Sequence, residues 1–284
     1  MYLSILDLLC CPSCRGALVI RDAACAGDEV INGKLQCSCG NCYPVVEGVV
    51  DFHATEQTIA NAWSDLDEQA LALETPEADR ARQDATLRAI ADRVAVSGAQ
   101  VLLDIACGVG RNLEALCRTL PQQTEILAVD LSAYVLHYDR KRFKELAPAR
   151  RISYLACDAT CLPIREGVLD AAATYEGFSN MPGVAHVALR EAHRVLKTGG
   201  VLVSSFCVIA RNSRGCERMK QYFSQHDIHG AEEFYLSDGC ILPVHEEMFS
   251  RTESAVAVEG NGAQGTQDLI PYPGEWFAEW IVTA

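Results

Sequence analysis

No uninterrupted apolar run in this sequence approaches the ~18 residues that a membrane-spanning helix needs. The longest candidate, residues 201–210, is too short and contains Ser204 and Ser205. The first residues, MYLSILDLL, have no basic stretch and include Asp7, so a secretory signal is not expected. These absences predict a cytoplasmic protein with no membrane partner.

Basic residues are also scarce. Only 24 Lys and Arg stand against 38 Asp and Glu, which leaves a net charge of −14 over 284 residues. Such a surface repels polyanions, which argues against a nucleic-acid partner. One short basic cluster, which we interpret as the solvated face of a helix, consists of Arg140, Lys141, Arg142, Lys144, Arg150 and Arg151.

Cysteine, by contrast, is abundant: the chain has 14. Half of them lie in the first 42 residues, at Cys10, Cys11, Cys14, Cys25, Cys37, Cys39 and Cys42. Without secretion, such a cluster holds a metal more often than it forms disulfides. Cys11-Pro12-Ser13-Cys14 is a CxxC knuckle with Gly16 just beyond it, and a second group follows at residues 37–42. Two such knuckles supply four thiolates, which suits tetrahedral Zn²⁺ in a structural site.

The second group leaves two pairings open, Cys37 with Cys39 or Cys39 with Cys42. The string CPxC followed by CxCGxxYPVVxGVVDF resembles the short zinc ribbon that precedes some bacterial methyltransferase domains. That resemblance favours Cys11, Cys14, Cys37 and Cys39 as ligands, with Cys42 either spare or a substitute. We therefore expect a zinc ribbon over residues 1–53 whose final strand covers residues 45–52.

Residues 54–97 are polar, alanine-rich and helical in pattern. Pro76 divides them into two helices, since proline suits the first turn of the second one. The segment is either a packing bundle at the domain edge or a lid and linker over a pocket, with Trp63 available for stacking.

From residue 98 the pattern changes to alternating strands and helices. Strands are expected at residues 101–103, 125–129, 152–157, 170–174 and 201–207, with helices at 113–120, 132–146 and 184–197. A hairpin of residues 252–258 and 276–282 completes the sheet. This pattern predicts an α/β fold, a doubly wound, mostly parallel, seven-stranded Rossmann-like sheet over residues 98–284. Residues 211–250 are read as an insertion that covers an acceptor site.

Acidic residues close successive strands, at Asp104, Asp130, Asp158 and Glu176. Ligands of such sheets bind at the carboxyl ends of the strands, and a glycine turn follows the first strand. A carboxylate before that turn would repel the pyrophosphate of a nicotinamide dinucleotide and attract the ammonium of S-adenosylmethionine. Asp130 suits a ribose diol and Asp158 an adenine amine, so the charges favour S-adenosylmethionine as cofactor.

Five strings in order, LLDIACGVGRNLE, AVDLS, LACDATCLP, LDAAATYEGFSN and REAHRVLKTGGVLVSS, resemble the motifs of class I S-adenosylmethionine-dependent methyltransferases. The resemblance implies that the methionine part is bound by Asp104, Ala106, Gly108 and Gly110, and the nucleoside by Asp130, Leu131, Asp158 and Ala159. Ala106 stands where many members have glycine. The resemblance also places Tyr175 and Glu176 beside the transferred methyl, Glu176 as candidate base or amine anchor and Tyr175 as a wall.

The leading hypothesis is a methyltransferase that acts on a small-molecule acceptor, amine-bearing or a natural product, by direct in-line transfer. The alternatives are an rRNA or tRNA base methyltransferase that uses the ribbon for recognition, and a non-enzymatic binding module. A third, thiol-dependent arsenic methylation, is suggested only by cysteines such as Cys157 and Cys161. His226, His229 and His245 are alternative bases.

Overall fold

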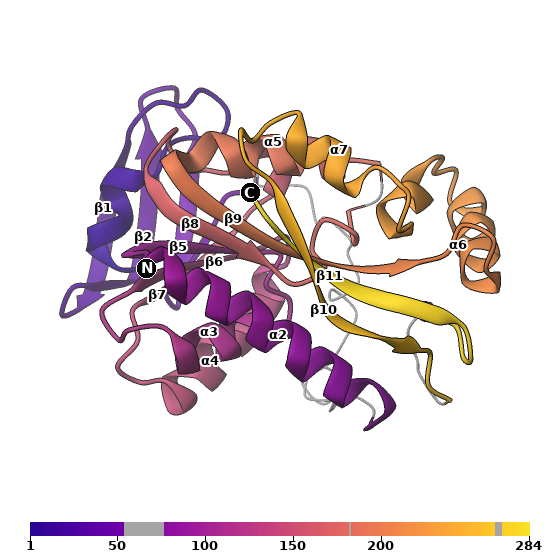
Figure 1. The fold of residues 1–284 in the computed structure, drawn as a ribbon. Coiled ribbons are helices and arrows are strands. Elements are labelled where there is room, and N and C mark those ends of the chain that lie inside the picture. The colour runs from indigo at the N-terminus through magenta and orange to yellow at the C-terminus, as the bar shows by residue number, and fades with distance from the viewer. Residues whose placement is uncertain (54–76, 182, 265–268) are drawn as a thin grey trace.

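The computed structural model describes residues 1–53, 77–181, 183–264 and 269–284 (Figure 1). The helix expected before Pro76, with Trp63, lies outside these residues. The helix expected after Pro76 is confirmed as α2 (Glu77–Ser97). None of the helices in the described ranges combines the length and the apolar character needed to cross a bilayer.

One mixed sheet organises the described chain, in the strand order β1-β2-β3-β4-β7-β6-β5-β8-β9-β11-β10. Its last seven strands form the predicted Rossmann-like sheet, with parallel pairing from β7 through β9. β11 pairs antiparallel with β9 and with β10, which confirms the predicted closing hairpin. These strands are β5 (Val101–Ile105), β6 (Glu125–Asp130), β7 (Ile152–Ala156), β8 (Leu169–Thr174), β9 (Leu196–Ile209), β10 (Glu253–Asn261) and β11 (Trp276–Thr283).

Helices cover both faces of this sheet, which explains why its strands are apolar almost throughout. α2, α3 (Arg111–Thr119) and α4 (Ala133–Leu146) lie on one face, and α5 (Ala185–Val195) and α7 (Ile241–Glu246) on the other (Figure 1). Ser132 caps α4 as expected, because its side chain accepts a hydrogen bond from the Val135 amide.

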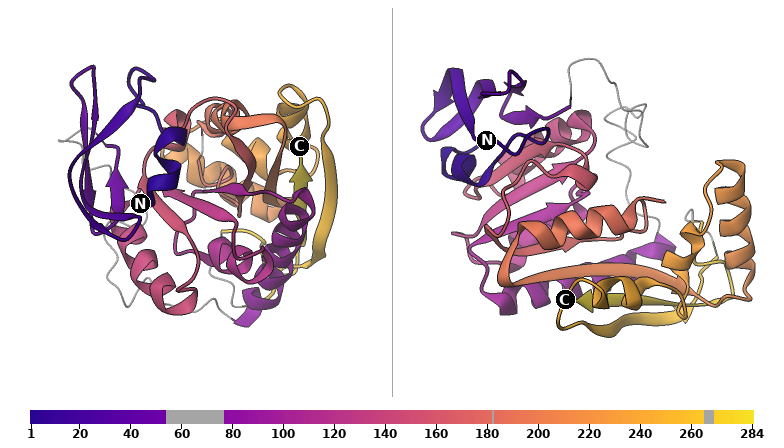
Figure 2. Two further views of the ribbon diagram at one scale, coloured as in Figure 1. Left: turned by 90° about the vertical axis from the view of Figure 1, so that its left-hand side faces the viewer. Right: turned by 90° about the horizontal axis from the view of Figure 1, so that it is seen from above.

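The N-terminal ribbon continues the same sheet rather than standing apart from it (Figure 2). The single strand expected at residues 45–52 is wrong. Residues 47 and 48 have positive φ angles of 45° and 80°, so the chain turns there between two antiparallel strands. The second of these pairs in parallel with β7, Val50 beside Leu155. The ribbon comprises η1 (Leu3–Leu8), β1 (Leu18–Ala26), β2 (Glu29–Cys37), β3 (Cys42–Val46) and β4 (Val49–Asp51).

Apolar packing also joins the ribbon to the main sheet. Leu35 and Tyr43 belong to the same buried cluster as Leu155, Leu162 and Ile164. A ribbon of this size buries little apolar surface by itself. Its stability therefore depends on the sheet behind it as well as on its cysteines.

The basic cluster of residues 140–151 is only partly the solvated face that the sequence suggested: Lys141 and Lys144 are exposed, but the arginines contact other parts of the fold. Arg140 is only 7% exposed and lies 2.6 Å from a Glu29 carboxylate oxygen of the ribbon. Arg142 lies 2.9 Å from Glu114 and donates to the Val109 carbonyl at 2.8 Å. Arg151 pairs with Glu125 at 3.5 Å. These cations hold parts of the fold together, and only the tertiary structure brings their partners to them.

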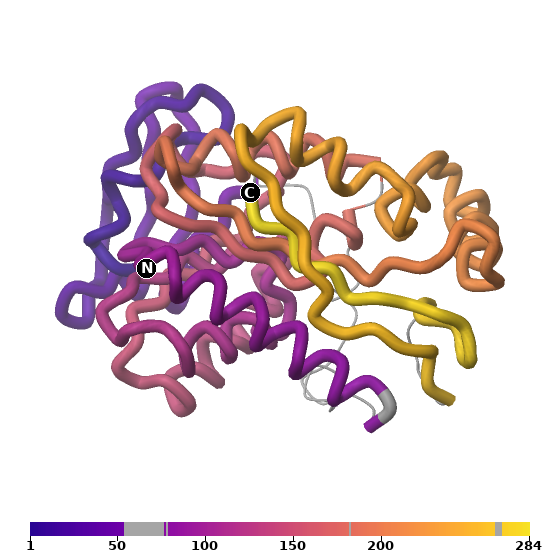
Figure 3. Tube along the Cα trace, in the orientation of Figure 1, coloured from indigo at the N-terminus to yellow at the C-terminus, as the bar shows by residue number. Residues whose placement is uncertain are grey.

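The insertion forms α6 (Arg214–Gln225), η3 (Ala231–Tyr235) and α7. α6 lies at the end of the molecule away from the ribbon (Figure 3). η3 approaches the main sheet, since Leu236 bridges to Ile209 and the Tyr235 hydroxyl donates to the Ser179 carbonyl. The insertion thus lies against the segment that follows Glu176.

Candidate cofactor and metal sites

The loop after β5 has an unusual backbone. Ala106, Gly108 and Gly110 all have positive φ angles, of 53°, 52° and 68°. At Gly110, which precedes α3, an added Cβ would lie 2.6 Å from an Asp139 carboxylate oxygen, so only glycine fits. Ala106 adopts a conformation that costs an alanine ~1 kcal/mol, which indicates that its surroundings hold it there.

Asp104 lies inside β5 rather than at the open edge that the sequence suggested. Its side chain is fully buried, and Oδ1 accepts a hydrogen bond from Asn112 Nδ2 at 2.7 Å. Oδ2 has no hydrogen-bond partner among the described residues. Burial raises the pKa of Asp104 to about 7, with Asn112 opposing and Asp130 adding to the shift. A buried carboxyl oxygen without a partner is suited to accept a hydrogen bond from a ligand.

Asp130 ties the loop to the next strand. Its Oδ2 accepts from the Gly108 amide at 2.9 Å and its Oδ1 from the Ser132 amide at 3.0 Å. Burial raises its pKa, and these amides oppose the shift. Each carboxylate oxygen can accept a further bond, and the side chain is still 6% exposed.

The other two nucleoside candidates follow the neighbouring strand. The Cys157 amide donates to the Asp130 carbonyl at 2.9 Å, which holds the segment after β7 beside Asp130. Asp158 is exposed, and its Oδ1 accepts from the Thr160 amide at 2.8 Å. Ala159 is buried and Leu131 half-buried. The structure thus brings the nucleoside candidates together at one edge of the sheet.

Glu176 lies in a strained turn that packs against the glycine loop. Its φ angle is 52°, and its amide donates to Ser205 Oγ at 3.0 Å. A Cβ on Gly177 would lie 3.0 Å from the Ala106 Cβ, so the two turns are in direct contact. Tyr175 precedes this turn, and burial raises its pKa well above the usual value, which keeps the phenol neutral.

Two further residues of this region escaped the sequence analysis. Arg82 of α2 lies 3.6 Å from Glu176 and 2.5 Å from Glu279 of β11. Glu279 is fully buried, and burial raises its pKa while Arg82 opposes the rise. Glu279 could have been found from the sequence, because it is a glutamate in the otherwise apolar strand WFAEWIVT. Arg82 stands in a polar segment, where nothing in the sequence distinguishes it.

The candidate histidine bases do not belong to this region. His245 is fully buried, with Nδ1 2.7 Å from the Ile241 carbonyl and Nε2 3.2 Å from Ser204 Oγ. Burial lowers its pKa to about 4. It is a packing residue of the core, and His226 and His229 are exposed.

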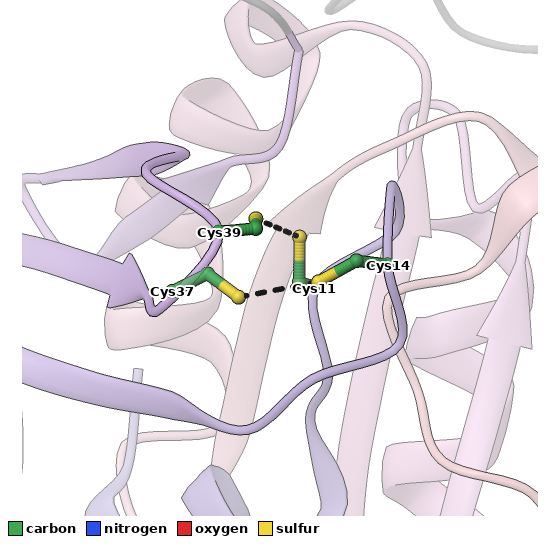
Figure 4. A group of neighbouring side chains, drawn as sticks. All are labelled: Cys11, Cys14, Cys37 and Cys39. Atoms are coloured by element: carbon green, nitrogen blue, oxygen red, sulfur yellow. Dashed lines mark hydrogen bonds between the residues drawn. The ribbon is translucent and has the colours of Figure 1, made fainter.

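Four cysteines converge between the Cys11–Cys14 turn and the end of β2 (Figure 4). The sulfurs of Cys11, Cys14, Cys37 and Cys39 all lie within 4.8 Å of one another. Cys11 and Cys39 are 3.8 Å apart, and Cys14 and Cys37 are 3.4 Å apart. Four thiolates at ~2.3 Å from one tetrahedral ion are ~3.8 Å apart, so the arrangement fits zinc.

The surroundings of Cys11 favour its thiolate form. Burial alone would raise the pKa of Cys11, but hydrogen bonds from the Tyr43 hydroxyl and from backbone amides lower it to about 6. A Cβ on Gly16 would lie 3.2 Å from the Cys14 sulfur, so the knuckle is closely packed. Cys42 is exposed and stands outside the group.

Comparisons with known proteins find two families along this chain. Residues 102–200 match the methyltransferase domain family, and residues 3–48 match the family described as Trm112p-like protein. A demethylmenaquinone methyltransferase from Lactiplantibacillus plantarum is 32% identical over 102 residues, 36% of this chain and 43% of the relative. The ubiquinone/menaquinone biosynthesis C-methyltransferase UbiE of Dinoroseobacter shibae is 33% identical over 115 residues, 40% and 45% of the two chains. The chain thus spans less than half the length of these relatives.

Solved structures share the fold at low identity. Phosphoethanolamine N-methyltransferase 2 of Haemonchus contortus aligns with a TM-score of 0.52 and 16% identity, over 72% of this chain and 52% of that one. A geranyl diphosphate methyltransferase aligns with a TM-score of 0.50 and 17% identity, over 77% and 94%. Residues 102–200 are thus a methyltransferase domain of the class I S-adenosylmethionine-dependent type, and residues 3–48 before them form a Trm112p-like domain that carries the cysteine cluster of a zinc ribbon.

Proposed function

We propose that this protein transfers a methyl group from S-adenosylmethionine to a small-molecule acceptor by direct in-line displacement. The observation that carries the proposal is the glycine loop braced by two buried aspartates, with a carboxyl oxygen of Asp104 left without a partner. Three positive φ angles open the loop backbone toward a ligand, and α3 begins at its end.

Each part of the cofactor has a counterpart among these residues. Asp104, Ala106, Gly108 and Gly110 would hold the methionine part, with Asp104 accepting from its ammonium. Asp130 and Leu131 would hold the ribose and the adjoining adenine edge, and Asp158 with Ala159 the adenine. Cationic ammonium and sulfonium groups suit a pocket with three carboxyls, whereas a pyrophosphate does not.

When bound, the sulfonium supplies an electrophilic methyl and a good leaving group. The chain then has mainly to position the acceptor in line and to exclude water. Glu176 is the proposed base or amine anchor, because its turn touches the glycine loop. Tyr175 is proposed as a wall: its hydroxyl accepts from Gln83 Nε2 at 3.4 Å, which holds the ring against α2.

A small acceptor fits the charge and the relatives better than RNA does. Two relatives are named as quinone methyltransferases, and a fold neighbour as a phosphoethanolamine methyltransferase. Two of the cations of residues 140–151 that RNA would need are engaged inside the fold, Arg140 with Glu29 and Arg142 with Glu114. All 14 cysteines are unpaired, which suits the reducing cytoplasm that we propose as its compartment.

Calorimetric titration tests the cofactor directly. We expect heat with S-adenosylmethionine and with S-adenosylhomocysteine, and formation of S-adenosylhomocysteine when a panel of phenols, quinols and amines is added. Heat with NADH and none with the two sulfur compounds would overturn the proposal.

We further propose that Cys11, Cys14, Cys37 and Cys39 bind one structural Zn²⁺. Metal analysis of the purified protein should find one zinc per chain. Cys37→Ser should lower that content and the melting temperature, and Cys42→Ser, the matched control, should change neither. Equal loss in both variants would contradict this ligand set.

A further inference from the structure

A buried charge cluster lies beside Glu176, between α2 and the sheet. Arg82 is 7% exposed, and its guanidinium lies within 3.6 Å of three carboxylates, Asp79, Glu176 and Glu279. Burial alone would lower the Arg82 pKa, but Glu279 and Glu176 raise it above its usual value. Buried ion pairs add little stability compared with apolar packing of the same volume. Removing one partner of such a pair is costly, however, so the cluster fixes the positions of its members relative to one another.

The helix that carries Arg82 has two different halves. Ile90, Ala91 and Val94 in its second half pack into the apolar cluster under α3 and α4. The first half instead buries Asp79, Arg82 and Thr86. Apolar contacts thus anchor one end of α2, and charged contacts locate the other end over the edge of β8, β9 and β11.

Glu279 reaches this cluster from the opposite side. On β11 it pairs with Cys207 of β9, and its Oε1 lies 2.5 Å from Arg82 Nη1. Its Oε2 is buried without a hydrogen-bond partner among the described residues. One oxygen therefore holds Arg82, and Cys207 and Glu176 lie close enough to the Glu279 carboxyl to oppose the rise in its pKa.

The excess charge of the cluster is negative. Among the described contacts, Arg82 faces three carboxylates, and Arg111 is linked to the same helix through Gln83, whose Oε1 accepts from its guanidinium at 3.2 Å. In a site of low dielectric, such an excess favours a cation and repels an anion.

We propose that Glu279 and Arg82 are positioning residues of the acceptor site, and that they hold the Glu176 carboxylate where it selects an acceptor with an amine. This inference rests on the proposed methyltransferase function and narrows its acceptor class. Glu279 fixes Arg82, and Arg82 fixes Glu176 in a turn that already packs on Ala106. The same charges disfavour an anionic group beside Glu176.

The test uses sinefungin, in which an amine replaces the sulfonium methyl and so occupies the place of the transferred group. Its affinity relative to S-adenosylhomocysteine reports on charge at that place and needs no acceptor. We expect the wild-type protein to prefer sinefungin, and Glu176→Gln and Glu279→Gln each to reduce the preference roughly tenfold. Affinity for S-adenosylhomocysteine should change less than about twofold, because this ligand has no amine at that place and groups without direct contact are nearly independent. Arg82→Lys, which keeps the charge, should retain most of the preference.

The double variant separates positioning from a simple charge effect. If Glu279 acts through Glu176, adding Glu279→Gln to Glu176→Gln should reduce the preference less than twofold further, rather than roughly tenfold again. Glu253→Gln, an exposed glutamate paired with Arg251 at the start of β10, is the matched control and should change nothing. Melting curves verify that each variant is folded.

Three results would overturn the inference while leaving the proposed function standing. They are equal wild-type affinity for the two ligands, an unchanged preference in Glu279→Gln, and fully multiplicative effects in the double variant. Failure of the wild-type protein to bind S-adenosylhomocysteine would overturn the proposed function and this inference with it.

Discussion

Asp104 is both a buried carboxyl with a raised pKa and the proposed partner of the cofactor ammonium. The variant Asp104→Asn tests both statements. The variant keeps the size of the side chain and an oxygen for the Asn112 hydrogen bond, but it cannot ionise. Burial raises the pKa of Asp104 from 3.8 to about 7. Between these two values the unfolded chain has lost a proton that the native protein still holds. Native stability therefore falls as the pH rises through this window, and falls no further above it.

The size of the effect follows from the pKa shift. One pKa unit corresponds to ~1.4 kcal/mol, so ionised Asp104 costs the free protein about 4 kcal/mol at pH 7 and above. The variant lacks this cost. The free energy of unfolding of the wild-type protein should thus fall by about 3 kcal/mol relative to the variant between pH 4 and pH 7.

A bound ammonium would stabilise the ionised form of Asp104. The wild-type protein should therefore release close to one proton per S-adenosylmethionine bound at pH 6, and the variant should release none from this position. Calorimetry in buffers of different ionisation enthalpy measures the proton release, and urea unfolding at several pH values measures the stability difference.

Asp170→Asn is the matched control with the opposite sign. Burial alone would raise the pKa of Asp170, but the hydrogen bond from Lys197 lowers it below the usual value. The ionised Asp170 therefore stabilises the native protein, and this stabilisation is lost as the pH falls. Parallel pH profiles of wild type and Asp104→Asn, together with no proton release on binding, would refute the reasoning for Asp104.

Three further predictions test the packing and the chemistry. Gly48→Ala should lower the free energy of unfolding by ~2–3 kcal/mol in urea titrations, because its Cβ would lie 2.3 Å from Arg140 Nε at a φ angle of 80°. Gly27→Ala, with a φ angle of 63° and no atom within 4 Å, should cost only ~1 kcal/mol, and equal losses would contradict the contact. Since burial lowers the His245 pKa from 6.5 to about 4, the wild-type protein should lose ~3 kcal/mol between pH 6.5 and 4. His245→Gln should lack this acid sensitivity in thermal melts, and an unchanged acid profile would refute the assignment. Glu176→Gln should slow methyl transfer at least a hundredfold without weakening S-adenosylhomocysteine binding, and unchanged turnover would remove Glu176 from the chemistry.

The order of strands and helices was predictable because it depends on local patterns. Apolar runs such as Val101–Ile105 and Ile152–Ala156 are bounded by polar turns, and both became buried strands. The α4 cap at Ser132 follows from the chemistry of one side chain near its own helix. The turn at residues 47 and 48 was missed, because the apolar residues on both sides of it read as one continuous strand.

The candidate site was only partly predictable. The glycines of the loop and the aspartates beside it lie within short sequence motifs, so they could be predicted from the sequence. Arg82 and Glu279 are 197 residues apart in the sequence. Their contact could not be predicted, because only the folded chain brings them together.

The sequence by itself determined the two domain types, the glycine loop with its acidic neighbours, and the presence of two cysteine knuckles. Each of these depends on residue spacing over a short stretch of chain. Only the tertiary structure decided that Cys37 rather than Cys42 joins the cluster, and that β4 extends the sheet beside β7. It also decided that Arg140 binds Glu29 of the ribbon. These outcomes depend on burial and on contacts between distant segments, because the free energy of a charge is set by what folding brings next to it.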